Sequence, residues 1–244
     1  MTESPSGGIL QVVSTPLGNL GDITLRSLEA LRNADTVLCE DTRQTGKLLK
    51  LLGLQANLQS YHAHNEHAML TRVLSALQSG KNLVLVSDAG TPGISDPGFL
   101  LIRYLLEHQV EVDVLPGPTA LIPSLLLSGF PCDRFVFEGF LPHKKGRSTR
   151  LEALREEART VILYESPHRI LRTVQDLMQV LGPQRRACLA RELTKVHQEA
   201  LRLSLVELEA RCSANPPKGE IVLVVEGKGK PASKQEDTDS LRLP

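Results

Sequence analysis

Short apolar runs alternate with amphipathic segments along this chain, and this alternation constrains the fold more than any other feature. The apolar runs cover residues 9–13, 36–39, 83–87, 110–115, 134–140, 160–165, 186–191 and 220–226. Runs without a polar alternation are typical of strands buried on both faces, as in parallel sheets covered by helices. The pattern therefore predicts an α/β fold with mainly parallel strand pairing.

Two of the intervening segments have clear helical periodicity. Residues 25–34 repeat leucine at helical spacing after Asp22 or Thr24, either of which is a candidate N-cap. Residues 170–181 keep one apolar face and stop before Gly182, a residue type that commonly ends helices. Both segments are predicted to be helices that connect neighbouring strands.

A proline- and glycine-rich break at 115–120 divides the chain. The segment "LPGPTA" ends a strand and precedes a helical run, so we predict an N-terminal α/β domain over 1–117 and a C-terminal α/β domain over 118–227. Residues 201–208 alternate between apolar and polar, which predicts an antiparallel strand and a mixed sheet in the second domain. Residues 228–244 have no periodicity and few apolar residues, and we expect a disordered tail there.

Composition excludes several classes of protein. Lys plus Arg and Asp plus Glu are 28 each in 244 residues, so the net charge gives no indication of a nucleic-acid partner. The four cysteines are far apart, which argues against a disulfide framework. The opening "MTESPSGG" lacks the basic and apolar regions of a signal peptide, and no uninterrupted apolar stretch is long enough for a membrane span. We expect a cytoplasmic protein with no membrane partner.

The stretch "SDAGTPGISDPG", residues 87–98, has the character of a ligand-binding loop. Five of its twelve residues are Gly or Pro, and it follows a buried strand, where open α/β sheets hold their ligands. Gly90 and Gly93 are expected to let backbone N–H groups approach a ligand, because no Cβ is in the way. Pro92 and Pro97 stiffen the loop and lower the entropy lost on binding.

A second loop of this kind, "STPLGNLGDIT" at 14–24, directly follows the first strand. It lacks the GxGxxG pattern of dinucleotide-binding folds, and no GxxxxGK[ST] phosphate loop occurs anywhere in the chain. The glycine-rich first loop of the commonest methyltransferase fold is missing as well. These absences weaken the usual nucleotide-binding interpretations, including a dinucleotide-dependent oxidoreductase.

A series of motifs in fixed order resembles a known family. The motifs are "STPLGNLGDITLRSLEAL", "CEDTRQTGKLL", "HAHNE", "LVSDAGTPGISDPG", "LPGPTALIPSL", "EGFLP", "YESPHRI", "ARELTK" and "KGEIVLVVEG". Over residues 9–227 they closely resemble the ribosomal RNA small subunit methyltransferase I family, of the tetrapyrrole-methylase (class III) superfamily. The resemblance implies a two-domain fold, S-adenosyl-L-methionine in the cleft between the domains, and a homodimer. It also implies 2′-O-methylation of a cytidine ribose in the decoding region of 16S rRNA in the small ribosomal subunit. Family members usually carry a further helical domain after the last strand, where this chain has the expected disordered tail at 228–244.

The same resemblance implies a set of cofactor contacts. Thr91 stands where many relatives have Asp, and Asp88 just upstream is the candidate to supply the carboxylate. The implied cofactor-binding residues are Pro16, Leu17, Gly18, Asp88, Gly90, Thr91, Pro92, Ile94, Ser95, Thr119, Ala120, Leu121, Tyr164, Glu165, Leu193, Gly219 and Glu220.

Three residues are candidates for catalysis. Lys195 and Glu192 in "ARELTK" form either a proton-relay pair or a surface salt bridge. Asn65 in "HAHNE" either orients the ribose or caps a helix. Methyl transfer depends mainly on alignment of the reactants, so a modest contribution from a general base is sufficient.

Basic residues in two segments are candidates for RNA binding. Arg43 either holds a phosphate or pairs with Glu40 or Asp41. The segment "HKKGRSTR", with Lys144, Lys145 and Arg147, is either a surface that follows RNA phosphates or a solvated loop. The histidines of "YHAHNEH" have no accompanying cysteine, and we expect no metal.

Two other functions stay open from the sequence. A methylase of a tetrapyrrole carbon shares the cofactor loops but has no need for the basic segment or the "EDTR" and "HNE" motifs. A non-catalytic ribosome-binding protein would lack affinity for the methyl donor.

Overall fold

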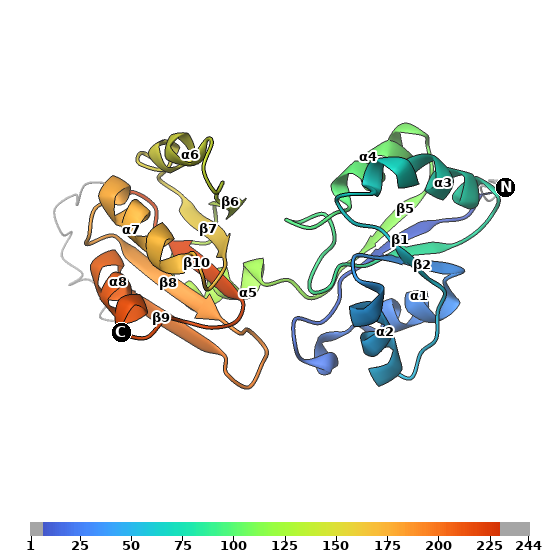
Figure 1. The fold of residues 1–244 in the computed structure, drawn as a ribbon, viewed down its shortest axis with the longest axis horizontal. Coiled ribbons are helices and arrows are strands. Elements are labelled where there is room, and N and C mark those ends of the chain that lie inside the picture. Colours follow the sequence, from blue (N-terminus) through green and yellow to red (C-terminus); the bar gives the residue numbers. More distant parts are fainter. Residues whose placement is uncertain (1–6, 230–244) are drawn as a thin grey trace, which may run out of the picture. The chain divides into compact units, whose positions relative to one another are not determined.

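A computed structural model describes residues 7–229, which form two compact α/β units (Figure 1). Among the described residues, the first unit comprises 7–123 together with 192–198, and the second comprises 124–191 together with 199–229. The division falls shortly after the predicted boundary at 117/118, and the segment 192–198 joins the first unit. Residues 230–244 of the predicted tail lie outside the described residues.

The first unit contains a sheet of five parallel strands. In chain order these are β1 (Leu10–Val13), β2 (Thr36–Cys39), β3 (Leu58–Ser60), β4 (Leu83–Leu85) and β5 (Val112–Leu115). Their order in the sheet is β3-β2-β4-β1-β5, and every neighbouring pair is parallel. The connecting helices are η1 (Leu20–Asp22), α1 (Leu25–Asn33), α2 (Thr42–Leu51), α3 (Glu66–Gln78) and α4 (Phe99–Glu107).

Helices cover both faces of this sheet, as the continuous apolar runs predict. Helices α1 and α2 contribute Leu31 and Leu49 to a core that includes Val13 and Val84. Helices α3 and α4 pack against the other face, in a second core that includes Leu10 and Leu85. The strand residues alternate between the two cores because successive side chains point to opposite faces of a strand. The predicted parallel α/β layers are confirmed.

The second unit contains a mixed sheet, which is also as predicted. Its strands are β6 (Phe135–Phe140), β7 (Thr160–Glu165), β8 (Arg186–Arg191), β9 (Glu199–Ser204) and β10 (Ile221–Val225), in the order β6-β7-β10-β8-β9. Only β6 and β7 pair in parallel among these strands. The helices are α5 (Leu121–Ser128), α6 (Arg147–Ala153), α7 (Ile170–Leu181) and α8 (Leu205–Ala214). Helices α7 and α8 share one core with the alternate residues of β8 and β10.

Local signals decide where the elements begin and end. Thr24, not Asp22, caps α1, because its hydroxyl accepts the backbone N–H of Ser27. The predicted strand over 201–208 is correct up to Ser204 and wrong beyond it. There the Ser204 hydroxyl accepts the Glu207 N–H while the Glu207 carboxylate accepts the Ser204 N–H, and this reciprocal cap starts α8.

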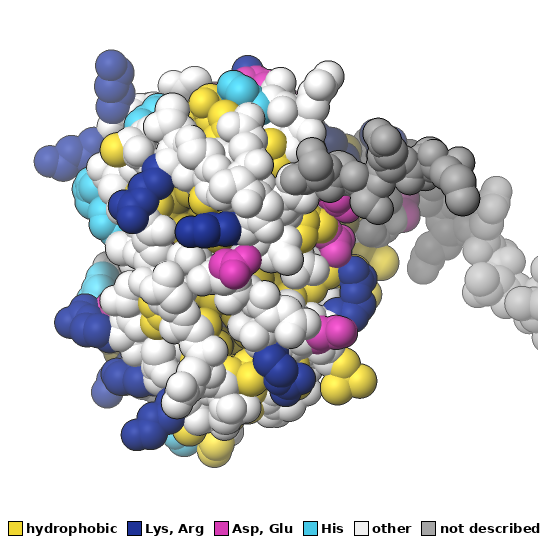
Figure 2. Space-filling view, turned by 90° about the vertical axis from the view of Figure 1, so that its right-hand side faces the viewer, with side chains coloured by type: hydrophobic (Ala, Val, Ile, Leu, Met, Phe, Trp, Pro, Cys, Tyr) yellow, Lys and Arg dark blue, Asp and Glu magenta, His cyan; other side chains and the backbone are white. Residues whose placement is uncertain are grey.

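Surface features of the described residues agree with the balanced composition. Figure 2 shows Lys and Arg side chains distributed over the face it draws, with acidic side chains among them. Among residues 7–229, no helix combines the length and apolar character needed to span a bilayer.

Candidate active site

The order of the strands in the first sheet defines a place for a ligand. From β1 the chain crosses the position of β4 to reach β2, whereas from β4 it crosses β1 to reach β5. The connections after the adjacent strands β1 and β4 therefore leave in opposite directions. In open α/β sheets such a switch point opens a crevice at the carboxyl ends of the strands, where ligands bind. The two loops at this point are the predicted ligand-binding loops 14–24 and 87–98.

These two loops are joined to each other by backbone hydrogen bonds. The Thr15 N–H donates to the Gly90 carbonyl over 2.9 Å, and the Gly90 N–H donates to the Thr15 carbonyl over 2.9 Å. The Thr15 hydroxyl also donates to the Ser87 carbonyl over 3.0 Å. Since Thr15 and Ser87 are buried, these bonds are shielded from water. The loops are thus fixed in position before any ligand binds.

Thr91 connects a third loop to this pair. Its hydroxyl oxygen lies 2.9 Å from that of Ser14, after β1, and donates to the Pro118 carbonyl, after β5, over 3.2 Å. Gly117 permits this arrangement, because a Cβ there would lie 2.9 Å from the Cβ of Ser14. Thr91 therefore holds together the loops that follow three adjacent strands.

We expect Thr91→Val to lower the free energy of unfolding by about 1–3 kcal/mol, because it leaves the Ser14 hydroxyl and the Pro118 carbonyl without this partner. Thermal or urea unfolding measures the change. The matched control is Thr71→Val, at an exposed position of α3. Equal stability of the two variants would show that Thr91 does not hold the loops together.

The glycines of the 87–98 loop serve backbone conformation rather than the exposure of N–H groups. Gly90 and Gly93 have φ of +83° and +84°, values that other residues rarely adopt. Their own N–H groups are hydrogen-bonded within the protein, and the approach of other backbone N–H groups of this loop to a ligand stays a prediction. The Gly90 N–H bonds to Thr15, and the Gly93 N–H donates to the Pro97 carbonyl over 3.2 Å.

The segment 192–198 lies over the first loop through Lys195. A Cβ on Gly18 would lie 2.3 Å from Cγ and 2.8 Å from Cε of Lys195, so the lysine stem packs directly on the Gly18 backbone. The Lys195 ammonium donates to the Glu192 carboxylate over 3.0 Å, with both side chains largely buried. Glu192 and Thr194 hold the turn with φ of +50° and +65°. The structure therefore places the Lys195–Glu192 ion pair at the first loop.

Carboxylates gather at the ends of β2 and β4. Burial, followed by the charges of Glu40 and Asp88, raises the pKa of Asp96 to about 6. Burial and the charge of Asp88 likewise raise the pKa of Glu40, and His62 opposes this. Asp88 also accepts the Asp41 N–H over 3.2 Å. A concentration of negative charge at this edge of the sheet favours a cationic ligand.

The raised pKa of Asp96 makes stability depend on pH. The folded protein keeps the Asp96 proton up to about pH 6, whereas the unfolded chain releases it near the ordinary pKa of 3.8. The stability that this proton contributes is therefore fully present below pH 3.8 and is lost as the pH rises through 6. Asparagine stays neutral at every pH. We therefore expect the free energy of unfolding of Asp96→Asn, relative to that of the wild type, to rise by about 1–2 kcal/mol as the pH goes from 4 to 7, after allowance for solvent screening. Urea unfolding across this range measures it, with exposed Asp133→Asn as control. A constant difference between Asp96→Asn and the wild type would contradict it.

The comparisons with known proteins identify the family of this chain. The Tetrapyrrole (Corrin/Porphyrin) Methylases family matches residues 10–209. A Synechocystis protein named ribosomal RNA small subunit methyltransferase I is 48% identical over 240 residues, covering 96% of this chain and 86% of its own length. A Thermotoga maritima protein of the same name is 42% identical over 221 residues, covering 91% and 99%. The chain belongs to the ribosomal RNA small subunit methyltransferase I family.

Solved structures of tetrapyrrole methyltransferases share the fold. Uroporphyrin-III C-methyltransferase from Thermus thermophilus, complexed with S-adenosyl homocysteine, aligns with a TM-score of 0.63 at 20% identity, over 90% of this chain and 97% of that one. The methyltransferase CobJ aligns with a TM-score of 0.68 at 20% identity, over 91% and 95%. The predicted tetrapyrrole-methylase-like fold is confirmed.

Within this family member, the structure gives Asn65 a local role. Its amide oxygen accepts the His62 N–H over 2.8 Å, and its amide nitrogen donates to the Ser60 carbonyl over 3.0 Å. Asn65 precedes α3 but makes no side-chain cap, so capping is not its function. The amide instead fixes the turn between β3 and α3.

The predicted RNA-binding cations are of two kinds. Arg43 is exposed and pairs with Asp41 through two bonds of 3.1 and 2.8 Å, which also lower the pKa of Asp41 to about 2. Lys144 and Lys145 are exposed as expected. The prediction for Arg147 is wrong, because its side chain is buried.

The buried Arg147 belongs to the interior of the second unit. It donates to Asp176 over 2.8 Å and to the Thr173 hydroxyl over 2.9 Å. Thr173 in turn donates to the Glu165 carboxylate over 2.6 Å, and the Ser166 N–H occupies the other Glu165 oxygen. The Glu165 carboxylate is therefore part of this buried network, and the residue as a whole is 3% exposed.

The remaining predicted contacts fall into two groups by unit. Pro16, Leu17, Gly18, Asp88, Gly90, Thr91, Pro92, Ile94, Ser95, Thr119, Ala120, Leu121 and Leu193 all lie in the first unit, whereas Tyr164, Glu165, Gly219 and Glu220 lie in the second. Tyr164 packs edge-on against Phe137. The predicted cleft between the domains stays a prediction.

Sequence reasoning missed the buried polar residues that join the loops. Ser14, Thr15 and Ser87 are each about 1–2% exposed, and each directly follows or nearly follows a buried strand. Their hydroxyl groups next to apolar runs were an available signal, since buried hydroxyls require hydrogen-bond partners. The raised pKa of Asp96 had no signal in the sequence, because it depends on burial and on Glu40 from a distant part of the chain, as well as on Asp88 of the same loop.

Proposed function

We propose that this chain transfers the methyl group of S-adenosyl-L-methionine to the 2′-hydroxyl of a cytidine in the decoding region of 16S rRNA, as a homodimer acting on the small ribosomal subunit. The observation that carries this proposal is the likeness, at 42–48% identity over nearly the whole chain, to proteins named ribosomal RNA small subunit methyltransferase I. The solved relative complexed with S-adenosyl homocysteine supports the choice of methyl donor.

The first unit offers suitable surroundings for that donor. Its loops meet at the switch point, where they are held by the Thr15–Gly90 bonds. The carboxylates of Glu40, Asp88 and Asp96 concentrate negative charge nearby, which suits the positive sulfonium group. Pro16, Leu17 and Gly18 on one loop and the 88–95 segment on the other would hold the donor.

The chain's own residues contribute mainly alignment. When bound, S-adenosylmethionine supplies an electrophilic methyl carbon. Holding two reactants in line contributes about 7–11 kcal/mol, whereas a general base adds about 10²–10⁴-fold. The rigid loops perform the first task. The Lys195–Glu192 pair performs the second, with Glu192 accepting the ribose hydroxyl proton while the Lys195 ammonium stabilises the negative charge that develops on the oxygen.

Arg43, Lys144 and Lys145 supply positive charge for the RNA backbone. The pair between Arg43 and Asp41 is no obstacle, since an exposed ion pair is worth at most about 1 kcal/mol and a phosphate can replace the carboxylate. Asn65 acts indirectly here, by fixing the turn that precedes α3.

Methyl transfer from labelled S-adenosylmethionine tests the proposal. Purified protein is incubated with small ribosomal subunits or with uroporphyrinogen, and the label in each acceptor is counted. We expect label in the rRNA alone. Label on the porphyrin alone would establish a tetrapyrrole methylase, and no calorimetric binding of the donor would establish a non-catalytic ribosome-binding protein.

A further inference from the structure

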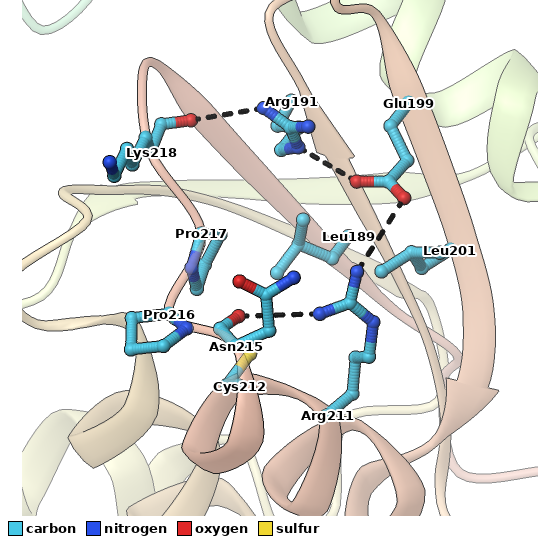
Figure 3. A pocket seen from close by; sticks show the side chains of 10 residues that line it. All are labelled: Leu189, Arg191, Glu199, Leu201, Arg211, Cys212, Asn215, Pro216, Pro217 and Lys218. Atoms are coloured by element: carbon cyan, nitrogen blue, oxygen red, sulfur yellow. Dashed lines mark hydrogen bonds and ion pairs between the residues drawn. The ribbon is translucent and has the colours of Figure 1, made fainter.

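A basic pocket lies in the second unit, and two of its residues, Arg191 and Glu199, directly flank the segment 192–198 in sequence. It has a volume of about 270 Å³. Figure 3 shows its walls, formed by the ends of β8 and β9, the last turn of α8 and the turn before β10. Leu189 and Cys212 give it an apolar floor, since they are 0% and 2% exposed. The polar residues lie around this floor.

Positive charge predominates in the pocket. Arg191, Arg211 and Lys218 line it with a single acidic residue, Glu199. The two guanidinium groups flank Glu199, whereas the Lys218 ammonium points away from them in Figure 3, at the rim of the pocket. Arg191 lies opposite Glu199 in the β8–β9 register and donates to it over 2.7 Å. A nitrogen of Arg211 lies 4.0 Å from the other Glu199 oxygen. Glu199 thereby holds the two guanidinium groups on either side of it.

The guanidinium groups are oriented but not saturated. Arg191 donates a second bond to the Lys218 carbonyl over 3.4 Å, and Arg211 donates to the Asn215 carbonyl over 3.3 Å. Each guanidinium has five N–H donors in a rigid fork, more than these contacts use. Forks fixed in this way lose little entropy when they bind a second oxyanion, and phosphate matches their geometry.

We propose that this pocket binds a phosphate of the RNA backbone through the guanidinium groups of Arg191 and Arg211, with Lys218 adding positive charge at its rim. The inference rests on the proposed function, because it names where the second unit contacts the RNA substrate. The volume exceeds that of a phosphate group alone and accommodates the attached ribose. Arg147, which the sequence suggested as an RNA-binding residue, is buried, and this pocket would supply a cationic contact with the RNA in its place.

The test compares four variants for binding to purified small ribosomal subunits over a series of salt concentrations. Lys218→Gln removes a charge from an exposed side chain and leaves the fold intact. Arg211→Gln removes a charge from the pocket itself. Glu199→Gln raises the positive charge, and Arg172→Gln removes an exposed arginine of α7 that does not line the pocket.

Lys218→Gln and Arg211→Gln should each bind about three- to tenfold more weakly, with a salt slope smaller by about 0.7–0.9 for one lost phosphate contact. Glu199→Gln should bind more tightly, and Arg172→Gln should match the wild type. Calorimetric affinity for S-adenosyl homocysteine should be unchanged in all four.

Three results would overturn the inference. In the first, the pocket variants keep the affinity and salt slope of the wild type, while methyl transfer to the subunit is normal; the proposed function then stands without the pocket. In the second, the pocket variants lose affinity for S-adenosyl homocysteine, which would assign the cations to the donor carboxylate. In the third, the wild type fails to bind the subunits, and the proposed function falls with the inference.

Discussion

Gly18→Ala is expected to lower kcat/KM at least about 100-fold and to weaken binding of the methyl donor about tenfold or more. The added Cβ would lie 2.3 Å from Cγ of Lys195, so the Lys195 stem must shift away from the first loop and carry its ammonium out of position. Displacement of a positioned group by about 1 Å costs about 10²-fold in rate. Calorimetry and initial rates measure the two effects separately.

Two variants control for the effect of the methyl group. Gly46→Ala makes the same change within α2, where the Cβ would meet nothing closer than 3.7 Å, and it should behave as the wild type. The double variant Gly18→Ala/Lys195→Ala removes the clashing stem and should recover donor affinity but not kcat. A Gly18→Ala variant with normal affinity and rate would show that this contact has no role in the site.

Lys195→Met is expected to lower kcat by about 10²–10³-fold with little change in donor affinity. Methionine keeps an apolar stem over Gly18 but removes the ammonium that pairs with Glu192. Loss of a group that assists proton transfer falls within the range of about 10²–10⁴-fold. Single-turnover rates at saturating donor and subunit separate this chemical step from binding.

Glu192→Gln provides the matching test of the partner. It preserves shape while removing the proton acceptor, and it should lower kcat by a similar factor, with less than additive loss when combined with Lys195→Met. Lys195→Arg keeps a positive charge and should retain more activity than Lys195→Met. Wild-type kcat in Lys195→Met would show that the pair is a salt bridge without a part in the reaction.

The layers of the fold were predictable because they depend on local patterns. Uninterrupted apolar runs predict strands buried on both faces, and the structure confirms a parallel sheet with helices on both sides. The strand β3 escaped prediction because its three residues are only partly buried and carry no apolar run. The end of β9 was misplaced because the Ser204–Glu207 cap overrides the alternation that continues to residue 208.

The candidate site was predictable as a pair of loops but not as a set of contacts. The loops were recognisable because glycine frees the backbone and proline restricts it, and both effects are local and therefore visible in the sequence. The partners of a charge depend on tertiary packing, and for this reason Arg147 was assigned to the surface although Asp176 and Thr173 hold it in the interior. The same reason hid the raised pKa of Asp96, which the structure explains by burial and two carboxylates.

Mass-spectrometric mapping of ribose methylation in 16S rRNA tests the central claim most directly. Small subunits from cells lacking this protein are compared with subunits from cells that regain the wild type or the Lys195→Met variant. We predict that one cytidine in the decoding region lacks its 2′-O-methyl group without the protein, regains it with the wild type, and stays largely unmethylated with Lys195→Met. An identical methylation map with and without the protein would contradict the account.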